Sequence, residues 1–509
     1  MIHRRSYRLD ELVLGGLAAR GKDLALMGSG ISLSGKETAD EVTRLTATLR
    51  AAGLTPGEAV LVAVDNHPSD LVCQLAVWQA DCVAVPVYRR HPVAVVSDIM
   101  QRCAARYLVG AVPLEWTELV TASRDVVHTL PSSDDGAAKR PQELDRDQAL
   151  VVFTSGSTGK PKGVVVSHRA FATKLCAIDS VLCFAEAATM LQVLHLHFSF
   201  GQWTSLLTLG SGGQLELIRR YETDLVLRRL ADAHYDRIAV VPTMMRMIAS
   251  RLTDRGGERL IASMRASGSP GLWIAGGEPL AAGLGRQFRS LLPRSRLADV
   301  FGLSESATSD FIVPPDEYDA LAGTIGHPSP GVEARVVPMD GQTAEAPFDV
   351  VGELWLRTPH LMTGYLGDRA ATTETMSGKW LKTGDLALKR RDGMFELAGR
   401  AKNLIVRGGM KISPLEVENV FSGHPDCSGV IATGVADTVL GERIHLVVTP
   451  HPGRIVDPSQ IRDWGRARIE AYKLPDVVHV IDVLPTGVTG KTDRLAVSEL
   501  VRERLSVNR

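Results

Sequence analysis

The sequence has few cysteines and no apolar run long enough to cross a membrane. Its six cysteines are spread over 509 residues and form no CxxC pair, which disfavours zinc fingers and redox dithiols. We expect buried, reduced thiols and a cytoplasmic protein. The richest apolar stretch, residues 71–86, is interrupted by Gln74, Gln79 and Asp81, so no membrane-spanning helix is predicted.

An excess of charge of either sign is also absent. There are 57 Lys and Arg residues against 58 Asp and Glu residues, giving a net charge of -1. That balance provides no overall attraction to nucleic acid or to an anionic membrane, and neither is expected as a partner. The short apolar run 12–19 follows Asp10 and Glu11, and we interpret it as an amphipathic first helix rather than a signal peptide.

The composition is that of a globular protein. Hydrophobic residues make up 45% and charged residues 23% of the chain, which excludes disorder for most of it. Strand-like and helix-like segments alternate, as is typical of βα units with mostly parallel sheets. The predicted strands include residues 60–65, 83–87, 151–153, 191–193, 238–241 and 272–274, and a helix is predicted over 69–79.

The pattern changes along the chain. Residues 131–148 are polar and rich in turn formers, which predicts a surface loop that leads into the strand at 149–153. From about residue 322 short β-like runs follow one another, and from about 403 the chain is typical of a compact α/β unit. We therefore predict an α/β fold with a large N-terminal domain, residues 1–400, that includes a β-rich subdomain. A small C-terminal α+β domain, residues 401–509, follows it.

The segment 154–163, TSGSTGKPKG, follows the strand VVF and combines glycines, hydroxyls and two lysines. Glycines let backbone N–H groups approach an anion closely, and hydroxyls and lysines add donors and charge. This composition predicts a phosphate-binding loop. It is not a Walker A loop, because Thr154 stands where the first glycine is required and Pro161 follows Lys160. Gly283 and Gly285 also fail as a dinucleotide fingerprint, because Phe288 takes the sixth position.

The loop resembles the signature of the adenylate-forming superfamily, which comprises acyl- and aryl-CoA synthetases, peptide-synthetase adenylation domains and luciferases. Further motifs of that family occur in the family's order between about residues 35 and 495. The resemblance implies that the loop holds the phosphates of ATP, with Thr154 also near Mg²⁺ and Lys162 acting in catalysis. The other residues that it assigns to the phosphates are Ser155, Gly156, Ser157, Thr158 and Gly159.

The segment FGLSE, residues 301–305, resembles the family's aromatic-Gly-x-Thr-Glu motif. By that resemblance Phe301 and Gly302 lie at the adenine, Ser304 contacts the α-phosphate and Glu305 holds Mg²⁺. A carboxylate suits such a hard cation, whose other ligands are phosphate oxygens. A hydrolase nucleophile is disfavoured here, because the near-GxSxG pattern ends in Ser306.

Two shorter motifs complete the nucleotide site that the resemblance implies. GGEP, at 276–279, resembles the loop along the adenine edge, with Gly277, Glu278 and Pro279 in contact and Asp299 near the amino group. Thr383-Gly384-Asp385 resembles the motif whose carboxylate accepts both ribose hydroxyls, a task for which its two oxygens are suited.

The remaining motifs lie toward the C-terminus. In GRAKNLIVRGGMKISPLEVE, residues 399–418, the family places Arg400 at the ribose and Lys402 at the hinge between domains. Gly408 and Gly409 would line the approach of a pantetheine arm. Lys491, in LPTGVTGKTDR at 484–494, matches the catalytic lysine.

The family places the acyl pocket at HLHFSFG, residues 195–201. Amino-acid-activating members carry an Asp where this chain has Gly201, and a buried ammonium without a carboxylate is costly, so an α-amino acid is disfavoured. His195 and His197 would share a face in a strand; they could contact the acid, whereas a metal pair lacks an evident third ligand. The expected pocket residues are His197, Phe198, Gly201, Trp203, Gly276 and Leu303.

The expected reaction is activation of a small carboxylic acid with ATP and Mg²⁺ to acyl-AMP, followed by transfer to the thiol of coenzyme A. A separate carrier protein's phosphopantetheine or an amine remains open as acceptor, and so does another oxyacid as substrate. A silent nucleotide-binding protein is opposed by the full set of motif residues. A phosphotransferase that releases ADP is opposed by the absence of Walker A and kinase signatures. A monomer or homodimer is expected.

Overall fold

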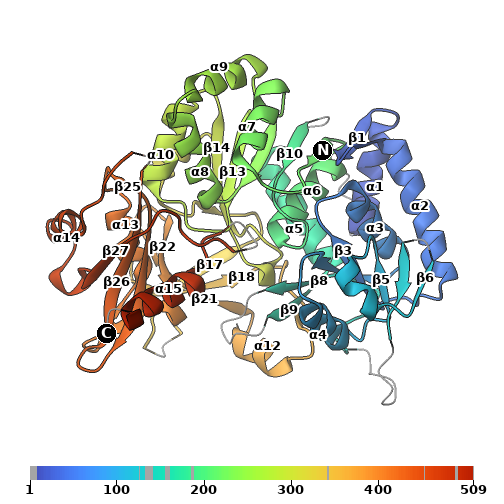
Figure 1. Cartoon of the computed structure of the whole chain (residues 1–509). Helices are drawn as coiled ribbons and strands as arrows, with labels where there is room; N and C mark the ends of the chain where they lie inside the picture. The colour runs from blue at the N-terminus through green and yellow to red at the C-terminus, as the bar shows by residue number, and fades with distance from the viewer. Residues whose placement is uncertain are drawn as a thin grey trace.

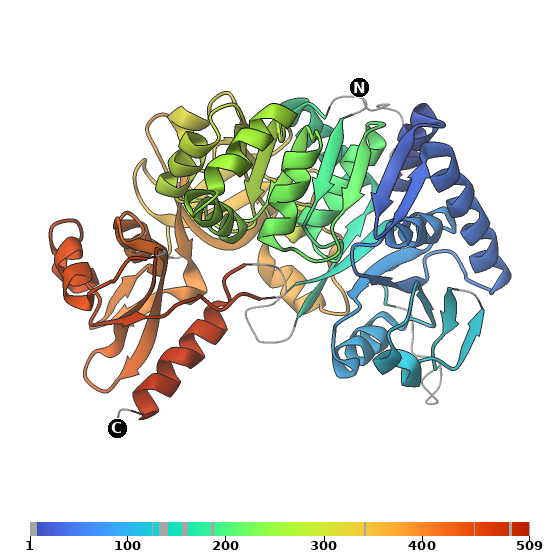
Figure 2. The ribbon, with the colours of Figure 1, turned by 45° about the horizontal axis from the view of Figure 1, so that its top comes forward.

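The computed structural model describes residues 8–124, 126–131, 141–154, 161–184, 188–340, 343–451, 453–487 and 491–507. These residues form four sheets, three in the N-terminal part and one in the C-terminal part. Figures 1 and 2 show the C-terminal part, coloured orange to red, as a separate unit beside the green elements. The α/β architecture predicted from the sequence is confirmed, including the β-rich subdomain and the small α+β C-terminal unit.

The first sheet carries the hairpin at which a phosphate loop is predicted. Its central strands β3, β4 and β8 are parallel, and β8 turns back into the antiparallel strand β9. In spatial order the strands are β19 (Gly364–Tyr365), β9 (Lys162–Ser167), β8 (Gln148–Thr154), β4 (Val83–Tyr88), β3 (Ala59–Val64), β5 (Tyr107–Val109), β7 (Val127–Thr129) and β6 (Ala122–Arg124).

The second sheet carries the expected adenine and acyl segments. From β1 through β14 its neighbours are parallel, and both of its edges are antiparallel. In spatial order the strands are β16 (His327–Pro328), β15 (Phe311–Val313), β14 (Arg296–Phe301), β13 (Leu272–Gly276), β12 (Arg237–Val240), β10 (Thr189–Gln192), β11 (Gln214–Leu217), β1 (Leu24–Gly28) and β2 (Ile31–Ser34).

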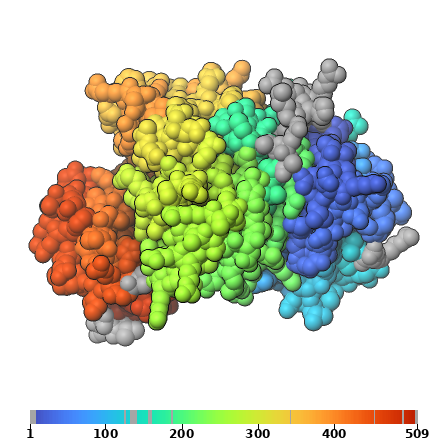
Figure 3. Space-filling view, turned by 90° about the horizontal axis from the view of Figure 1, so that it is seen from above, coloured from blue at the N-terminus to red at the C-terminus, as the bar shows by residue number. Residues whose placement is uncertain are grey.

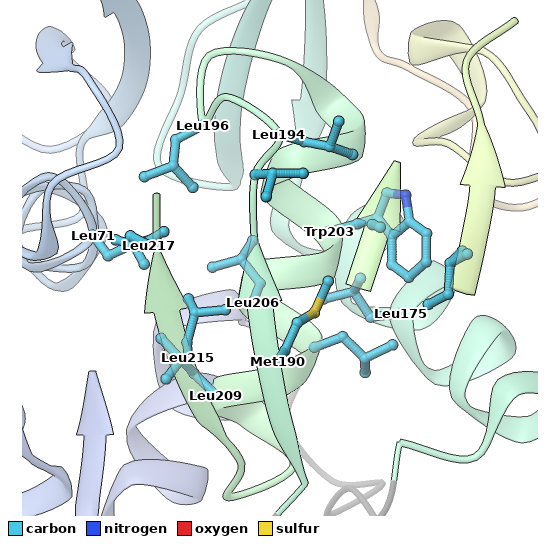
Figure 4. Close-up of a cluster of buried hydrophobic side chains, with 14 of the residues drawn as sticks. Leu71, Leu175, Met190, Leu194, Leu196, Trp203, Leu206, Leu209, Leu215 and Leu217 are labelled. Atoms are coloured by element: carbon cyan, nitrogen blue, oxygen red, sulfur yellow. The ribbon is translucent and has the colours of Figure 1, made fainter. Parts of the chain in front are cut away.

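Helices α5 (His168–Leu182) and α6 (Ser199–Gly210) lie between these two sheets and form much of the core. Residues 201–209 of α6 are all buried, and the Gln202, Thr204 and Thr208 side chains among them form hydrogen bonds within the core. Figure 4 shows its leucines against the strands β10 and β11, with Trp203 and Leu194 at one end of the cluster. The first helix expected around residues 12–19 is present as α1 (Leu9–Arg20), which packs on α6.

The β-rich subdomain and the C-terminal part are antiparallel apart from one parallel pair. The subdomain contains β17 (Glu333–Val337), β18 (Gly352–Arg357), β21 (Trp380–Lys389), β20 (Met376–Ser377) and β22 (Phe395–Arg400). The C-terminal sheet contains β24 (Met410–Ile412), β23 (Ile405–Arg407), β26 (Gly441–Pro450), β25 (Cys427–Asp437) and β27 (Val477–Val480). Helices α13 (Pro414–Phe421), α14 (Pro458–Arg466) and α15 (Arg494–Val507) accompany it.

The predicted strands and the helix at 69–79 are present, with ends that differ by a few residues. The strand predicted at 60–65 is β3, the helix is α3 (Pro68–Gln79), and the strand predicted at 191–193 is β10, which ends at Gln192. His195 and His197 therefore lie in the loop after β10 and not in a strand. Of the predicted surface loop, residues 132–140 lie outside the described residues.

A buried ion pair fixes the loop that follows β14. Lys174 of α5 and Asp310 are both fully buried, and the ammonium lies 2.9 Å from the carboxylate. Asp310 also accepts hydrogen bonds from the Ser306 hydroxyl and from the Leu303 amide. The three residues between Ser306 and Asp310, residues 307–309, have φ values of 56°, 87° and 35°. Three successive non-glycine residues in the left-handed region are strained, so the loop depends on these contacts to keep its shape.

We expect Lys174→Met to destabilise the N-terminal domain by about 3–5 kcal/mol, because it leaves the Asp310 carboxylate buried without its cation. Urea unfolding followed by tryptophan fluorescence measures the loss. Adding Asp310→Asn should recover most of it, because the amide is neutral and its oxygen can still accept from Ser306 and Leu303. The exposed pair Lys36–Asp40 provides the control, and Lys36→Met should change the urea midpoint little. Equal midpoints for Lys174→Met and Lys36→Met would contradict this account.

Candidate active site

A cavity of about 2000 Å³ lies between the N-terminal sheets and the C-terminal part. It is lined by Lys162, Glu305 and Asp385 from the N-terminal part and by Lys491 from the C-terminal part. The space-filling view in Figure 3 shows the C-terminal atoms in red directly beside the green ones. Residues from four distant motifs of the sequence therefore meet at one cavity.

The phosphate side of this cavity is the β8–β9 hairpin. Thr154 ends β8 and pairs with Lys162 at the start of β9, and both residues line the cavity. The other residues assigned to the phosphates lie outside the described residues: Ser155, Gly156, Ser157, Thr158 and Gly159. The strand β8, which precedes the loop, is apolar because most of it is buried within the sheet.

Ser304 and Glu305 lie in a single turn of helix, η2 (Ser304–Ser306), after β14. The Ser304 and Ser199 hydroxyls are hydrogen bonded at 2.9 Å. The Glu305 carboxylate accepts a hydrogen bond of 2.9 Å from the Tyr365 hydroxyl. Within the described residues no three His, Cys, Asp or Glu side chains gather to hold a metal. One carboxylate beside a phosphate hairpin fits Mg²⁺, which takes its remaining ligands from phosphate and water.

Asp385 and Arg400 face each other across β21 and β22. The guanidinium donates from Nε to Oδ1 at 2.7 Å and from Nη2 to Oδ2 at 3.4 Å. Burial raises the pKa of Asp385, and Arg400 opposes that shift. Lys402, in η3 (Ala401–Asn403), lines the cavity one turn beyond. The two residues that the sequence assigns to the ribose are thus an ion pair beside the predicted hinge lysine.

Lys491 reaches the cavity from the C-terminal part and lies against Gly277. A Cβ atom at Gly277 would lie 3.0 Å from Lys491 Cε and 3.2 Å from Nζ, and Gly277 has a φ of 82°. Burial lowers the pKa of Lys491, and Glu278 opposes the shift. A residue with a Cβ atom would be strained in this backbone conformation, and that atom would crowd the end of the lysine side chain.

Glu278 joins the two parts of the chain. One carboxylate oxygen accepts from the Thr243 amide and hydroxyl at 3.1 and 2.9 Å, at the start of α8 (Pro242–Thr253). The other oxygen accepts from the Thr492 amide at 2.8 Å. Because Thr492 follows Lys491 directly, this bond fixes the backbone that carries the lysine.

A second cavity of about 310 Å³ lies beside the first and is lined by Pro279, Asp299 and Phe301. Burial raises the pKa of Asp299 to about 8, so its carboxyl is mostly protonated at neutral pH and can donate as well as accept a hydrogen bond. Gly302 lines the larger cavity, and a Cβ there would lie 2.1 Å from the Ser309 amide nitrogen. The residues expected at the adenine therefore lie together.

The predicted acyl pocket is only partly assembled as expected. Phe198, Gly201, Trp203 and Leu303 line the cavity. A Cβ at Gly201 would lie 2.2 Å from the His195 carbonyl oxygen, so a carboxylate side chain has no room there. The ring of Phe200 stacks on Trp203 with centroids 5.5 Å apart and forms an apolar wall.

Two expected pocket residues, His197 and Gly276, are absent from the described lining of the cavity. His195 lines the cavity, whereas the His197 ring is buried and stacks on Tyr88 with centroids 4.9 Å apart. The two histidine rings lie with centroids 5.6 Å apart in the loop after β10, and the His195 ring also lies 4.9 Å from that of Tyr88. Gly276 lies beneath the surface, where a Cβ would meet Val300 at 2.6 Å and Phe200 at 3.0 Å.

Gly408 and Gly409 lie apart from these residues. They form the exposed turn between β23 and β24, with φ values of 57° and 82°. They are absent from the described lining of the cavity. In this arrangement Lys491 occupies the cavity and the two glycines do not.

Comparison with protein families assigns this arrangement. The model for AMP-binding enzymes matches residues 17–366, and the model for the AMP-binding enzyme C-terminal domain matches residues 416–491. The chain belongs to the AMP-binding enzyme family. It is an adenylate-forming ligase of the acyl-CoA synthetase type.

Named relatives of this AMP-binding enzyme include CoA ligases and a carrier-protein ligase. A feruloyl-CoA synthase from Amycolatopsis sp is 31% identical over 476 residues, which cover 92% of this chain and 94% of that protein. The fatty acid–[acyl-carrier-protein] ligase ScoC of Streptomyces coeruleorubidus is 28% identical over 488 residues, with 92% of both chains covered.

The solved structures share the fold. The anthranilate CoA ligase AuaEII in complex with anthranoyl-AMP has a TM-score of 0.83 at 22% identity and covers 97% of both chains. ATP-bound MatB from Rhodopseudomonas palustris has a TM-score of 0.82 at 22% identity and covers 97% of this chain and 99% of that one.

Sequence reasoning missed several residues of this AMP-binding enzyme's site. Ser199, Thr243, Arg246 and Tyr365 contact predicted site residues or line the cavity. Of these four, Ser199 stands within the motif at 195–201 that the sequence analysis singled out, and the other three stand in none. Thr243 was the easiest of these to find from the sequence, because it follows a predicted strand at the start of a helix. The carboxyl ends of parallel strands lie together at one edge of a sheet, where ligands bind.

We expect Gly277→Ala to reduce acid-dependent pyrophosphate release at least tenfold in this family member, because the new methyl group displaces the Lys491 side chain. Gly393→Ala is the matched control, since Gly393 has a φ of 87° and open space around it. Both variants introduce the same backbone strain, so their melting temperatures should fall alike. Equal activity of the two variants would contradict the contact with Lys491.

Proposed function

We propose that the protein activates a small carboxylic acid with ATP to acyl-AMP, releases pyrophosphate, and transfers the acyl group to the thiol of coenzyme A. The observation that supports this most directly is Lys491 in the same cavity as Lys162, Glu305 and Asp385. The match to AMP-binding enzymes, the feruloyl-CoA synthase relative and the absence of room for a carboxylate at Gly201 agree with it.

In the first step an oxygen of the acid attacks the α-phosphorus, and the bond to the β-phosphate oxygen breaks. The ammonium of Lys491 stabilises the negative charge that develops on the carboxylate and the α-phosphate. Lys162 and the hairpin 154–162 hold the leaving phosphates. Mg²⁺ bound at Glu305 would neutralise phosphate charge.

In the second step we propose that the C-terminal part turns about Lys402. This movement would break the hydrogen bond between Thr492 and Glu278 and withdraw Lys491. Gly408 and Gly409 would then line the path of the pantetheine arm, since their open surroundings leave space for it. The thiol attacks the acyl carbon and AMP leaves.

The acceptor has one specific alternative. The relative ScoC is named a fatty acid–[acyl-carrier-protein] ligase, so a carrier protein's phosphopantetheine is the second candidate. Both acceptors present the same thiol at the end of the same arm, and they differ in the protein that would dock beside it.

Product analysis tests the proposal. The protein is incubated with ATP, Mg²⁺ and a panel of aliphatic and aryl acids, with and without coenzyme A. We expect acid-dependent AMP and pyrophosphate, and a thioester only when coenzyme A is present. Adenylation without a CoA thioester would favour the carrier-protein alternative. ADP as the product would contradict the proposal.

We expect Lys491→Ala to slow adenylation by about 10²–10³, as for loss of a donor that stabilises developing charge. Thioester formation from supplied acyl-AMP should be far less affected, because Lys491 has left the cavity in the proposed second step. Stopped-flow measurement of each half-reaction separates the two. Lys36→Ala is the control, because the Lys36 side chain is exposed at the start of α2 (Gly35–Ala51). Equal losses in both half-reactions would contradict the two-orientation mechanism.

A further inference from the structure

Tyr365 connects the two charged groups on the phosphate side of the cavity. Its hydroxyl donates to Glu305 Oε1 at 2.9 Å. The Lys162 Nζ atom lies 4.5 Å from the centroid of its ring, which is within the range of a cation–π interaction. One side chain therefore contacts both the expected metal ligand and the expected phosphate-binding cation.

The backbone around Tyr365 is fixed to the same two elements. Strand β19 pairs with β9, so Tyr365 lies opposite Val164 in the hairpin that carries Lys162. The Leu366 amide donates to the Gly163 carbonyl at 2.8 Å. At the other end of the segment, the Met362 amide donates to the Glu305 carbonyl at 2.7 Å. Residues 362–366 thus bridge the phosphate hairpin and the loop of Glu305.

The Tyr365 phenol is the donor in its bond with the Glu305 carboxylate, because a carboxylate oxygen can only accept. Among the described residues no other side chain donates to the Glu305 carboxylate. The bond from Tyr365 holds the Oε1 atom of this carboxylate. A metal-ligating carboxylate held in this way is oriented before the metal arrives.

We propose that Tyr365 is a positioning residue for Mg²⁺·ATP, which orients Glu305 through its hydroxyl and Lys162 through its ring. The inference depends on the proposed roles of Glu305 and Lys162. The two contacts should have separable effects, because the Tyr365 hydroxyl acts on the metal ligand Glu305 and the Tyr365 ring acts on the ammonium of Lys162.

Two substitutions separate these effects. Tyr365→Phe removes the hydrogen bond to Glu305 and keeps the ring under Lys162, whereas Tyr365→Leu removes both. ATP binding is measured by calorimetry without any acid, over a series of Mg²⁺ concentrations and in EDTA. The readout is the Mg²⁺ concentration that gives half of the full increase in ATP affinity.

We expect Tyr365→Phe to raise that Mg²⁺ concentration by about tenfold or more, as for loss of an outer-shell partner. Its ATP affinity in EDTA should stay within about twofold of the unsubstituted protein. Tyr365→Leu should show the same Mg²⁺ shift and a further loss of ATP affinity in EDTA of about threefold to tenfold.

Tyr235→Phe is the matched control. The Tyr235 hydroxyl donates to a buried glutamate, Glu216, at 2.5 Å in the core of the N-terminal domain. The described lining of the two cavities contains neither residue. This variant should lower the melting temperature without changing the Mg²⁺ requirement.

An unchanged Mg²⁺ requirement in Tyr365→Phe, or an equal shift in Tyr235→Phe, would overturn the inference. So would ATP binding by the unsubstituted protein that does not depend on Mg²⁺. The proposed function is tested apart from this, since it requires acid-dependent AMP. If no acid yields AMP but Tyr365→Phe still shifts the Mg²⁺ requirement, the positioning role stands and the proposed function fails.

Discussion

The hydrogen bond from the Thr492 amide to Glu278 holds the backbone next to Lys491 against the N-terminal part, so that residues of both parts line one cavity. The N-terminal part supplies the hairpin, the carboxylates and the apolar wall, and the C-terminal part supplies Lys491. Glu278 divides its two oxygens between α8 and the loop of the lysine. A charge-assisted bond of this kind contributes about 1.5–3 kcal/mol. That is enough to favour this orientation and small enough to be broken by the proposed turn of the C-terminal part.

The N-terminal side of the site is held much more firmly. Lys174 and Asp310 form an ion pair with no exposure to solvent, and Asp310 holds the loop that carries Ser304 and Glu305. On the other side of that loop, Tyr365 contacts Glu305 and lies on a strand that pairs with the phosphate hairpin. The loop of Glu305 and the phosphate hairpin are thus held in place by a buried ion pair and by pairing between strands. The one group that is proposed to leave is held by exchangeable hydrogen bonds.

The acyl side shows how far local patterns reach. Phe198, Gly201 and Trp203, which come from the motif HLHFSFG and the helix after it, line the cavity. The described lining contains His195 and not His197, although the centroids of both rings lie 4.9 Å from that of Tyr88. Strand alternation could not separate the two histidines, because β10 ends at Gln192 and both follow it in a loop.

The sequence by itself determined the fold class, the family and most of the charged residues of the site. Those residues lie in short segments in which local chemistry selects the residue type. Gly277, for example, has a positive φ, and Glu305 places a carboxylate shortly after the strand β14. Only the tertiary structure decided the partners: Tyr365 for Glu305 and Lys162, Asp310 for Lys174, Arg400 for Asp385, and Glu278 for Thr492. Apart from Asp385 and Arg400, the members of each pair are 60 or more positions apart. Their contacts arise from how strands and helices pack, and no local spacing encodes that packing.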